Sequence, residues 1–441
     1  MDLLIFLELQ TPRTDYIFNH IFVDLFGLDV QYTTDKNIYL KSRLPKIQYG
    51  FKSICENNCL FFNSVNLLFE NDIRKQDLQV SYFKKIKVFF DCESKDSSLP
   101  FDVFAASFYM ISRYEEYLIY NKDKLGRFPA ELSLAFKHSI LDVPIVDHWI
   151  LILKKIITNK FPELIFKDHK FKFINTIDVD SAYSYLDKGF CRTILSCFKD
   201  IFFFDFYNLR LRFEVIFFGK KDPYDTFNKI LTLHKQYKLE SIFFFLLSNY
   251  TYYDRNTNFM TKRFNNLINK IYNLCNVGIH GSFLSSTNYK KLKSEINRLS
   301  KLTKSQVVYN RQHYINLRLP ETYKNLIKNG ILHDFTMGYN SHPGFRAGTC
   351  FCFNFFDLDL NRSTNLKVHS FAIMDVTLKD YLLLNPDDAL SLIKKIIKSV
   401  SEVNGKFISI FHNESLDYSG RWSGWEGVYE DMINFVKSEE G

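Results

Sequence analysis

The segment TIDVD at residues 176–180 holds the side chains whose spacing first indicates chemistry, and it follows the apolar run FKFI at 171–174. If that run is a β-strand, side chains two residues apart point to the same face, so Asp178 and Asp180 project together from its carboxyl end. Neighbouring carboxylates repel each other, and proteins tolerate them where a cation bridges them or where one acts as a base. The alternative is a solvated, aspartate-rich turn after a strand.

Imidazole and guanidinium groups follow later apolar runs. His280 comes after residues 277–279, Arg311 and His313 come after residues 307–309, and His412 comes after residues 407–411. In parallel α/β arrangements, reactive groups gather at the carboxyl ends of the strands. We therefore expect these four side chains and the two aspartates to meet at one edge of a sheet.

Helical patterns separate these runs from about residue 170 onward. Apolar spacing, caps and breakers predict helices over residues 222–237, 264–272, 289–302, 320–330 and 386–405. Residues 241–247 predict one more buried strand. Repeated strand–helix units at this spacing predict an α/β fold with a parallel sheet, closed or open, and helices outside it.

The first part of the chain has a different texture, with short strands and helices in no regular alternation. Its clearest predicted helix covers residues 104–120, where Arg113 and Glu116 are expected to belong to a structural ion-pair network. No linker rich in Pro, Gly or Ser marks a boundary. The pattern alone predicts an amino-terminal accessory α/β domain at residues 1–165 and a second domain at residues 166–441.

Charge and hydropathy restrict the class of partner. The chain has 57 Lys and Arg against 49 Asp and Glu, and this excess is scattered without a basic block, which argues against a dedicated nucleic-acid binder. Such a balance tolerates an anionic glycan or a membrane-proximal substrate. No apolar run approaches the length of a membrane span, and the first residues lack the basic region of a secretion signal. These features predict a cytoplasmic protein with no membrane span.

The eight cysteines show no pair at the two-residue spacing of zinc knuckles or redox motifs, so we expect reduced thiols. Cys55 with Cys59, and Cys350 with Cys352, are less favoured alternatives as metal ligands.

Taken in order, these segments resemble the polysaccharide deacetylases of the NodB-homology type, a carbohydrate esterase family whose catalytic domain is a distorted (β/α) barrel. The resemblance covers residues 170–415. It implies that Asp178 is the general base and Asp180 a metal ligand, that His280 is a second ligand, that Arg311 holds the base in position, and that His412 is the general acid.

One position departs from the family pattern. The second motif of the family offers another histidine four residues after the first, and this position is Leu284, which cannot bind a metal. A catalytic zinc usually has three protein ligands and one open place. His313 is the candidate for the missing ligand because its loop also ends a strand. Zinc is the expected ion, and without a third ligand either the metal affinity would be poor or the protein would be an inactive relative.

A second resemblance, over the full length, is to a bacterial subgroup that carries an extra amino-terminal domain. Residues 108–117 and 344–349 carry it. Arg346 in the second of these segments, Tyr314 beside the proposed ligand, and Trp425 are the candidate substrate contacts. The alternatives are that Arg346 pins a loop and that Trp425 belongs to a segment that caps the barrel.

The predicted activity is the metal-dependent removal of N-acetyl or O-acetyl groups from a carbohydrate or glycan precursor. A bound divalent ion would polarise the carbonyl and lower the pKa of bound water, while Asp178 accepts a proton and His412 protonates the leaving group. Two other functions remain open. One is a glycan-binding relative that has lost turnover, and the other is a glycosyltransferase that holds a nucleotide sugar through its Asp-Val-Asp triplet, although the first 165 residues show no Gly-rich phosphate loop.

Overall fold

A computed structural model gives the structure of the chain, and it describes residues 2–54, 58–417 and 419–440. The chain folds into two compact units. The first comprises residues 1–171 together with two later segments, Gly344–Ser370 and Ser399–Gly405. The second comprises Lys172–Pro343, Phe371–Lys398 and Lys406–Gly441. The division expected at residue 165 therefore differs from this one, chiefly because the first unit takes up two segments from far along the chain.

The first unit contains a parallel sheet in the order β2-β1-β3-β4. Its strands are β1 (Leu3–Leu7), β2 (Val30–Thr33), β3 (Lys46–Gly50) and β4 (Cys59–Asn63). Two antiparallel pairs complete the strands of this unit: β5 (Val80–Phe83) with β6 (Ile86–Phe89), and β12 (Phe353–Asp357) with β13 (Arg362–Ser370). The helices of this unit are α1 (Pro12–Phe18), α2 (Lys36–Lys41), α3 (Val103–Ile111), α4 (Leu134–Lys137) and α5 (Ile145–Lys160).

Helix α3 is shorter than the helix predicted over residues 104–120. It begins after Asp102, whose side chain accepts hydrogen bonds from the backbone amides of Phe104 and Ala105, and it ends at Ile111. Arg113 then takes a left-handed conformation, with φ of 54°, and a short 3-10 turn follows. The Nε of Arg113 lies 2.8 Å from Glu116 Oε1, so the expected ion pair forms across this break in the helix.

The cysteines differ in part from expectation. Cys59 forms a disulfide bond, so the expectation of a reduced thiol, and the alternative of a metal ligand, are wrong at this position. Cys55 lies outside the described residues. The free thiols of the described residues are Cys92, Cys191, Cys197, Cys275, Cys350 and Cys352.

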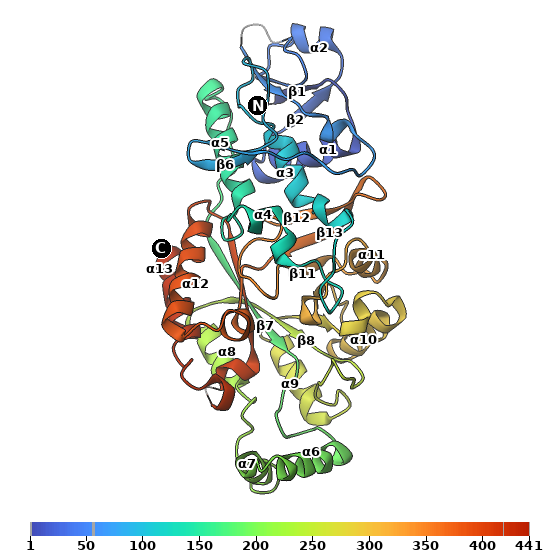
Figure 1. Cartoon of the computed structure of the whole chain (residues 1–441), viewed down its shortest axis with the longest axis vertical. Coiled ribbons are helices and arrows are strands. Elements are labelled where there is room, and N and C mark those ends of the chain that lie inside the picture. Colours follow the sequence, from blue (N-terminus) through green and yellow to red (C-terminus); the bar gives the residue numbers. More distant parts are fainter. Residues whose placement is uncertain (1, 55–57, 418, 441) are drawn as a thin grey trace. The chain divides into compact units, whose positions relative to one another are not determined.

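The second unit is built on parallel strands in the order β11-β10-β9-β8-β7-β15-β14. Figure 1 labels β7, β8 and β11 among them. Its strands are β7 (Lys172–Val179), β8 (Glu240–Phe245), β9 (Asn276–Gly281), β10 (Tyr309–Gln312), β11 (His333–Met337), β14 (Ile373–Met374) and β15 (Lys406–His412). The pairs β7–β8, β8–β9, β9–β10, β10–β11, β7–β15 and β14–β15 are all parallel.

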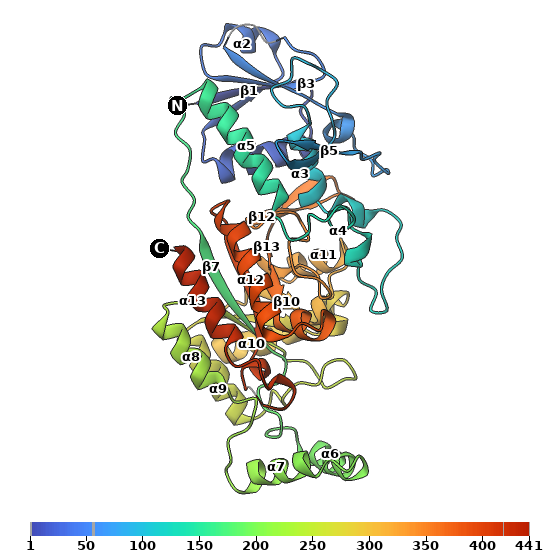
Figure 2. The same ribbon diagram turned by 60° about the vertical axis from the view of Figure 1, so that its left-hand side comes forward.

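Helices connect these strands, as the sequence predicts. They are α6 (Phe190–Phe202), α7 (Phe206–Phe217), α8 (Phe227–Gln236), α9 (Lys262–Tyr272), α10 (Tyr289–Thr303), α11 (Glu321–Lys328), α12 (Pro386–Ser401) and α13 (Val428–Glu440) (Figures 1 and 2). Helix α8 begins later than expected because Asp222 does not cap it. The Asp222 carboxylate instead accepts hydrogen bonds from the backbone amides of Ser184 and Tyr185.

The two faces of this sheet contact different parts of the unit, because successive side chains along a strand point to opposite faces. One face encloses an apolar cluster that includes Ile174, Phe244 and Ile410. On the opposite face, the Asn175 side chain donates to the Tyr429 hydroxyl of α13 at 2.8 Å and lies 2.8 Å from the His234 ring of α8. Curling around the inner cluster makes the sheet resemble half of a barrel. Among the described residues, no pairing joins β11 to β14, so the complete (β/α) barrel that was expected is not found.

None of the helices in the described ranges is both apolar enough and long enough to pass through a bilayer.

Candidate functional site

Strand register brings the predicted groups together at the carboxyl edge of the second unit's sheet. In the pair β15–β7, His412 lies opposite Asp178, and in the pair β10–β9, Arg311 lies opposite His280. Asp180 follows β7 directly, and His313 follows β10. The expectation that acids from the first strand meet imidazoles from later strands therefore agrees with the geometry.

Asp180, His280 and His313 form the centre of the cluster. Their ligand atoms all lie within 4.8 Å of one another. His280 Nε2 is 3.1 Å from Asp180 Oδ1, and His313 Nε2 is 3.3 Å from Asp180 Oδ2. Asp180 Oδ1 is buried, and its contact with His280 Nε2 lacks the alignment of a regular hydrogen bond. One carboxylate and two imidazoles are a donor set typical of a catalytic zinc with an open place, and an oxygen without a well-aligned hydrogen bond fits such an ion.

The far ring nitrogens of both histidines are anchored. His280 Nδ1 lies 3.0 Å from the backbone oxygen of Arg311, and His313 Nδ1 lies 3.0 Å from Asp254 Oδ1. Asp254 is fully buried and also accepts a hydrogen bond from the backbone amide of Phe283. A histidine that donates through Nδ1 presents Nε2 as a metal ligand, and such anchoring is the usual arrangement behind ligating histidines. Both Nε2 atoms here point to Asp180.

Gly281 explains how β9 and β10 come this close. A Cβ at this position would lie 2.6 Å from the side-chain nitrogen of Gln312. Only glycine gives that space without displacing Gln312.

The electrostatics of the cluster show carboxylates and imidazoles stabilising one another. Burial acts to raise the pKa of Asp180, but the charge of His313 and the close contacts of His280 and His313 with its carboxylate hold this pKa well below its ordinary value. Burial acts to lower the pKa of His313, but Asp180 and Asp254 raise it to about 9. Without an ion, protonated His313 therefore balances the two carboxylates, and a divalent cation would take over that charge and displace the proton.

Asp178 lies beside the cluster and is held by a buried guanidinium. Its Oδ1 accepts a hydrogen bond of 2.7 Å from Nη1 of Arg311, which also donates to Thr176 Oγ1 at 2.7 Å. Arg311 is fully buried, with its guanidinium 4.6 Å from the ring centre of Phe244. The other oxygen of Asp178, Oδ2, is 3.7 Å from His280 Nε2. Arg311 thus fixes Asp178 and leaves one carboxylate oxygen turned toward the cluster.

His412 is the third imidazole of the site, and Asp375 holds it. Its Nδ1 is 2.8 Å from Asp375 Oδ1, and its backbone amide donates to Asp375 Oδ2 at 2.7 Å. Its Nε2 lies 3.9 Å from Asp180 Oδ2. Burial acts to lower the pKa of His412, but the adjacent Asp375 carboxylate raises it to about 10. A protonated imidazole oriented in this way can donate a proton from Nε2.

Asp254 and Asp375 are the residues that the sequence analysis missed. Asp375 directly follows the short apolar strand β14, so the rule that found Asp178 could have found it. Asp254 lies in an irregular loop between β8 and α9, and no sequence signal marks it.

The three predicted substrate contacts have different surroundings. Tyr314 is partly exposed beside His313, with 4.3 Å between ring centres. Trp425 is buried, with its ring centre 5.7 Å from that of Trp422 and 5.1 Å from Lys379 Nζ. This packing agrees with the alternative of a capping segment.

Arg346 belongs to the first unit. Its guanidinium is buried and donates from Nη2 to Glu116 Oε2 at 2.6 Å and from Nε to Glu116 Oε1 at 2.8 Å. These bonds pin the loop to the Arg113–Glu116 network, which agrees with the alternative that Arg346 has a structural role.

Leu284, the departure from the family pattern, is half exposed in a short turn after β9. His313 lies where its own Nε2 completes the group with Asp180 and His280, so the loss of a histidine at position 284 does not leave the cluster with two ligands.

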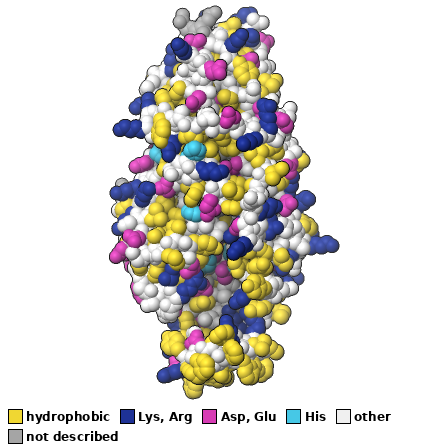
Figure 3. All heavy atoms as spheres, viewed as in Figure 1, with side chains coloured by type: hydrophobic (Ala, Val, Ile, Leu, Met, Phe, Trp, Pro, Cys, Tyr) yellow, Lys and Arg dark blue, Asp and Glu magenta, His cyan; other side chains and the backbone are white. Residues whose placement is uncertain are grey.

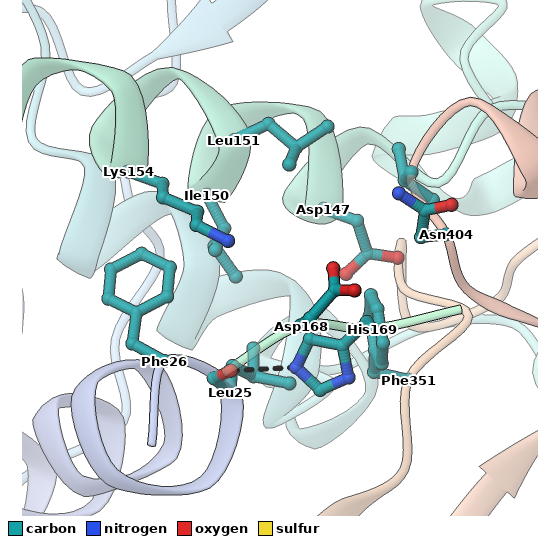
Figure 4. A pocket seen from close by; sticks show the side chains of 11 residues that line it. Leu25, Phe26, Asp147, Ile150, Leu151, Lys154, Asp168, His169, Phe351 and Asn404 are labelled. Carbon is teal, nitrogen blue, oxygen red and sulfur yellow. Dashed lines mark hydrogen bonds between the residues drawn. The ribbon is translucent and has the colours of Figure 1, made fainter. Parts of the chain in front are cut away.

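Another hollow lies within the first unit (Figure 4). Apolar side chains such as Leu25, Ile150 and Phe351 line most of it. Its buried carboxylate, Asp147, accepts hydrogen bonds from Thr349 Oγ1 and the backbone amide of Cys350. Burial raises the pKa of Asp147 to about 6. Lys154, Asp168, His169 and Asn404 also line the hollow, and the His169 ring lies 2.7 Å from the backbone oxygen of Leu25.

Fold and site together define a mixed α/β protein with an Asp–His cluster at the carboxyl edge of a curled parallel sheet. Residues 3–162 match a family of unknown function, DUF7033. None of the curated proteins matches the chain.

Solved structures similar to the chain include polysaccharide deacetylases at low identity. A putative polysaccharide deacetylase from Mycobacterium smegmatis is 14% identical, with a TM-score of 0.39 over 62% of this chain and 85% of that chain. A CE4 family pseudoenzyme from Bacillus anthracis is 12% identical, with a TM-score of 0.31 over 61% of this chain and 62% of that chain. The polysaccharide deacetylase Bc1974 from Bacillus cereus is 10% identical, with a TM-score of 0.29 over 62% of this chain and 89% of that chain. At these values the similarities support no inference about activity.

Proposed function

We propose that the protein is a metal-dependent deacetylase that removes N-acetyl or O-acetyl groups from a carbohydrate or glycan precursor. One observation carries the proposal: Asp180, His280 and His313 converge as a ligand group, with Asp178 held by Arg311 on one side and His412 held by Asp375 on the other. The order of these residues along the chain also resembles that of the polysaccharide deacetylases.

Asp180, His280 and His313 would hold the ion, with zinc as the first candidate. When bound, a divalent ion polarises an acyl carbonyl and makes bound water a nucleophile near neutral pH. The donor set of one carboxylate and two imidazoles supports this assignment, as does Asp180 Oδ1, which has no well-aligned hydrogen bond.

Asp178 is proposed as the general base. Its oxygen Oδ2 is turned toward the ligand group, 3.7 Å from His280 Nε2, while Arg311 fixes Oδ1. Hydrolysis of an acetyl group needs a proton taken from the attacking water and a proton given to the departing nitrogen or oxygen. His412 is proposed as the donor, because Asp375 orients Nδ1 and leaves Nε2 facing the cluster.

Partly exposed Tyr314 beside His313 is the proposed substrate contact near the reacting atoms. A glycosyltransferase would use the two aspartates but would leave the ordered groups Arg311 and His412 without a task. A deacetylase gives both a role.

The cytoplasmic location expected from the sequence is a separate proposal. The disulfide bond at Cys59 counts against it, because disulfides persist mainly in oxidising compartments. Fractionation of the cells that make the protein would test this point directly.

The test of function is zinc titration by calorimetry together with acetate release from an acetylated chitooligosaccharide. Wild-type protein should bind about one zinc per chain, and chelation should abolish acetate release. Asp178→Asn should keep the zinc and lose hydrolysis, whereas the exposed control Asp387→Asn should retain both. Zinc binding with no acetate release from N- or O-acetylated sugars would indicate a glycan-binding relative, and consumption of a nucleotide sugar would indicate a transferase.

A further inference from the structure

Helices α6 and α7 form a hairpin that the chain inserts shortly after the Asp178–Asp180 segment. In Figures 1 and 2 the hairpin lies beyond the carboxyl end of β7, the edge of the sheet that carries the site. Figure 3 shows hydrophobic side chains gathered at that end of the view. The hairpin has no role in the proposed chemistry.

Helix α6 presents its apolar side to solvent. None of its residues is buried. At helical spacing, one side of it is apolar, and its exposed members are Phe190, Ile194, Leu195, Phe198, Ile201 and Phe202. The opposite side carries Arg192, Ser196 and Asp200, which are less exposed. A helix that packs on a protein core shows the reverse arrangement.

Polar contacts fasten the inward side of the hairpin. Arg212 of α7, itself buried, donates to Asp200 of α6 at 2.7 Å and lies 4.9 Å from the ring centre of Tyr185. Arg192 lies 3.8 Å from the ring centre of Tyr250 and bonds the backbone oxygen of Asn256. The polar side is bonded to other segments of the second unit, and the apolar side therefore faces outward.

Aromatic side chains are strongly exposed where the two helices meet. Phe202, Phe203 and Phe204 are 77%, 67% and 79% exposed, and Phe206 and Tyr207 continue the series. Along α7, Phe213 and Phe217 are exposed with their rings stacked at 5.6 Å. Apolar surface of this extent marks an interaction site.

The hairpin also carries an excess of positive charge. Residues 188–221 contain seven lysines and arginines against three carboxylates, an excess of four. The three carboxylates are engaged: Asp200 by Arg212, Asp205 by Asn208, and Glu214 by Arg210 and Lys220. Arg192 and Arg212 are held on the inward side, so the exposed cations outside these contacts are Lys199 and Lys221. Exposed Lys199 follows Phe198 on α6, next to the apolar side. Cations beside an outward aromatic face are typical of helices that lie in a membrane interface.

We propose that this hairpin docks onto the surface of an anionic lipid bilayer, with its phenylalanines in the interface and its cations at the headgroups. The apolar side chains point outward from α6, from the connection and from α7, so a fluid bilayer can surround them all, whereas one flat protein surface would cover only part. Docking would hold the second unit at the membrane, where a membrane-proximal glycan is within reach. The proposal rests on the hairpin alone and stands whether or not the protein is a deacetylase.

The test is flotation of the full chain with two kinds of phosphatidylcholine vesicle. One kind contains roughly 30% phosphatidylglycerol, which makes its surface anionic, and the other kind contains none. Wild-type protein should float with the anionic vesicles and bind the neutral ones more weakly. Changing Phe198, Phe202 and Phe203 together to Ser should reduce binding by roughly 1,000-fold, since each buried phenylalanine contributes on the order of a tenfold change. The side chains are exposed, so the variant should fold as the wild type does.

The matched control changes Ile119, Ile165 and Leu383 to Ser, three strongly exposed apolar residues outside the hairpin. It should bind as the wild type does. Lys199→Glu should weaken binding to anionic vesicles only. Absence of flotation with both vesicle types, or an equal loss in the control, would overturn the proposal. A dimer seen by sedimentation without lipid, and lost in the triple phenylalanine variant, would also overturn the proposal. In that case a second copy of the chain would cover this face.

Discussion

Replacement of Arg311 by Met is the sharpest test of how the site is built. Arg311 is fully buried and donates to Asp178 Oδ1 at 2.7 Å, to Thr176 Oγ1 at 2.7 Å and to the backbone oxygen of Phe335 at 3.0 Å. Methionine keeps much of the apolar stem but leaves the Asp178 carboxylate buried without its cation. Breaking a buried ion pair from one side costs about 3–5 kcal/mol of unfolding free energy.

The double variant Arg311→Met with Asp178→Asn separates charge from packing. If the main cost is the unpaired carboxylate, the double variant should be more stable than Arg311→Met alone, with a coupling energy of about 2 kcal/mol or more. Urea unfolding of metal-free protein at pH 7, followed by circular dichroism, measures all four states of the cycle. Thr176→Val is the control, because it removes a neutral partner of Arg311 and should cost only about 1 kcal/mol. Additive effects, with coupling below about 0.5 kcal/mol, would refute the idea that Arg311 compensates the charge of Asp178.

Other residues of the second unit give further tests. His313→Ala should release the bound zinc, as measured by metal analysis after dialysis, and zinc retained by this variant would exclude His313 as a ligand. Asp254→Asn should weaken zinc binding by roughly 10- to 100-fold, because the His313 ring loses the carboxylate that orients it. His412→Ala should lower kcat by a factor of roughly 100–10,000 with zinc still bound, and an unchanged kcat would exclude it as the acid. Burial lowers the pKa of His234 from 6.5 to about 4, so the unfolded chain binds more protons between these values, and stability present above pH 6.5 should be lost as the pH falls toward 4. The free energy of unfolding should fall by about 3 kcal/mol over this range. Urea unfolding at pH 7 and pH 4 should show that His234→Gln lacks this fall, and a pH dependence equal to that of the wild type would contradict the role given to His234.

Local sequence pattern predicted most of the second unit. Apolar runs with helices between them gave the positions of β7, β8, β9 and β15, because a buried parallel strand must be apolar on both faces. Strand β10 was predicted at residues 307–309, but the structure places it at Tyr309–Gln312. The polar residues Asn310, Arg311 and Gln312 had the pattern of a loop. Each is buried and bonded to a partner from another strand, as Asn310 is to Asp334 at 2.8 Å. Such partners are not visible in the sequence.

The first unit was predicted less well. Its parallel sheet β2-β1-β3-β4 was not expected, and two of its segments come from beyond residue 340. Arg346 illustrates the reason: it lies in a Gly-rich segment that resembled a substrate loop, yet its guanidinium is bonded to Glu116, 230 positions earlier in the chain. A contact between such distant residues has no local signature.

The sequence by itself determined which chemical groups the protein has at strand ends: Asp178, Asp180, His280, Arg311, His313 and His412. It could do so because parallel strands present the residues at their carboxyl ends to one edge. Only the tertiary structure decided that His313 points its Nε2 to Asp180, that Asp375 and Asp254 orient the imidazoles, and that the phenylalanines of α6 face solvent. Distances and exposure depend on sheet register and on which side of a helix is bonded to the fold, and both are set by contacts between residues far apart in the chain.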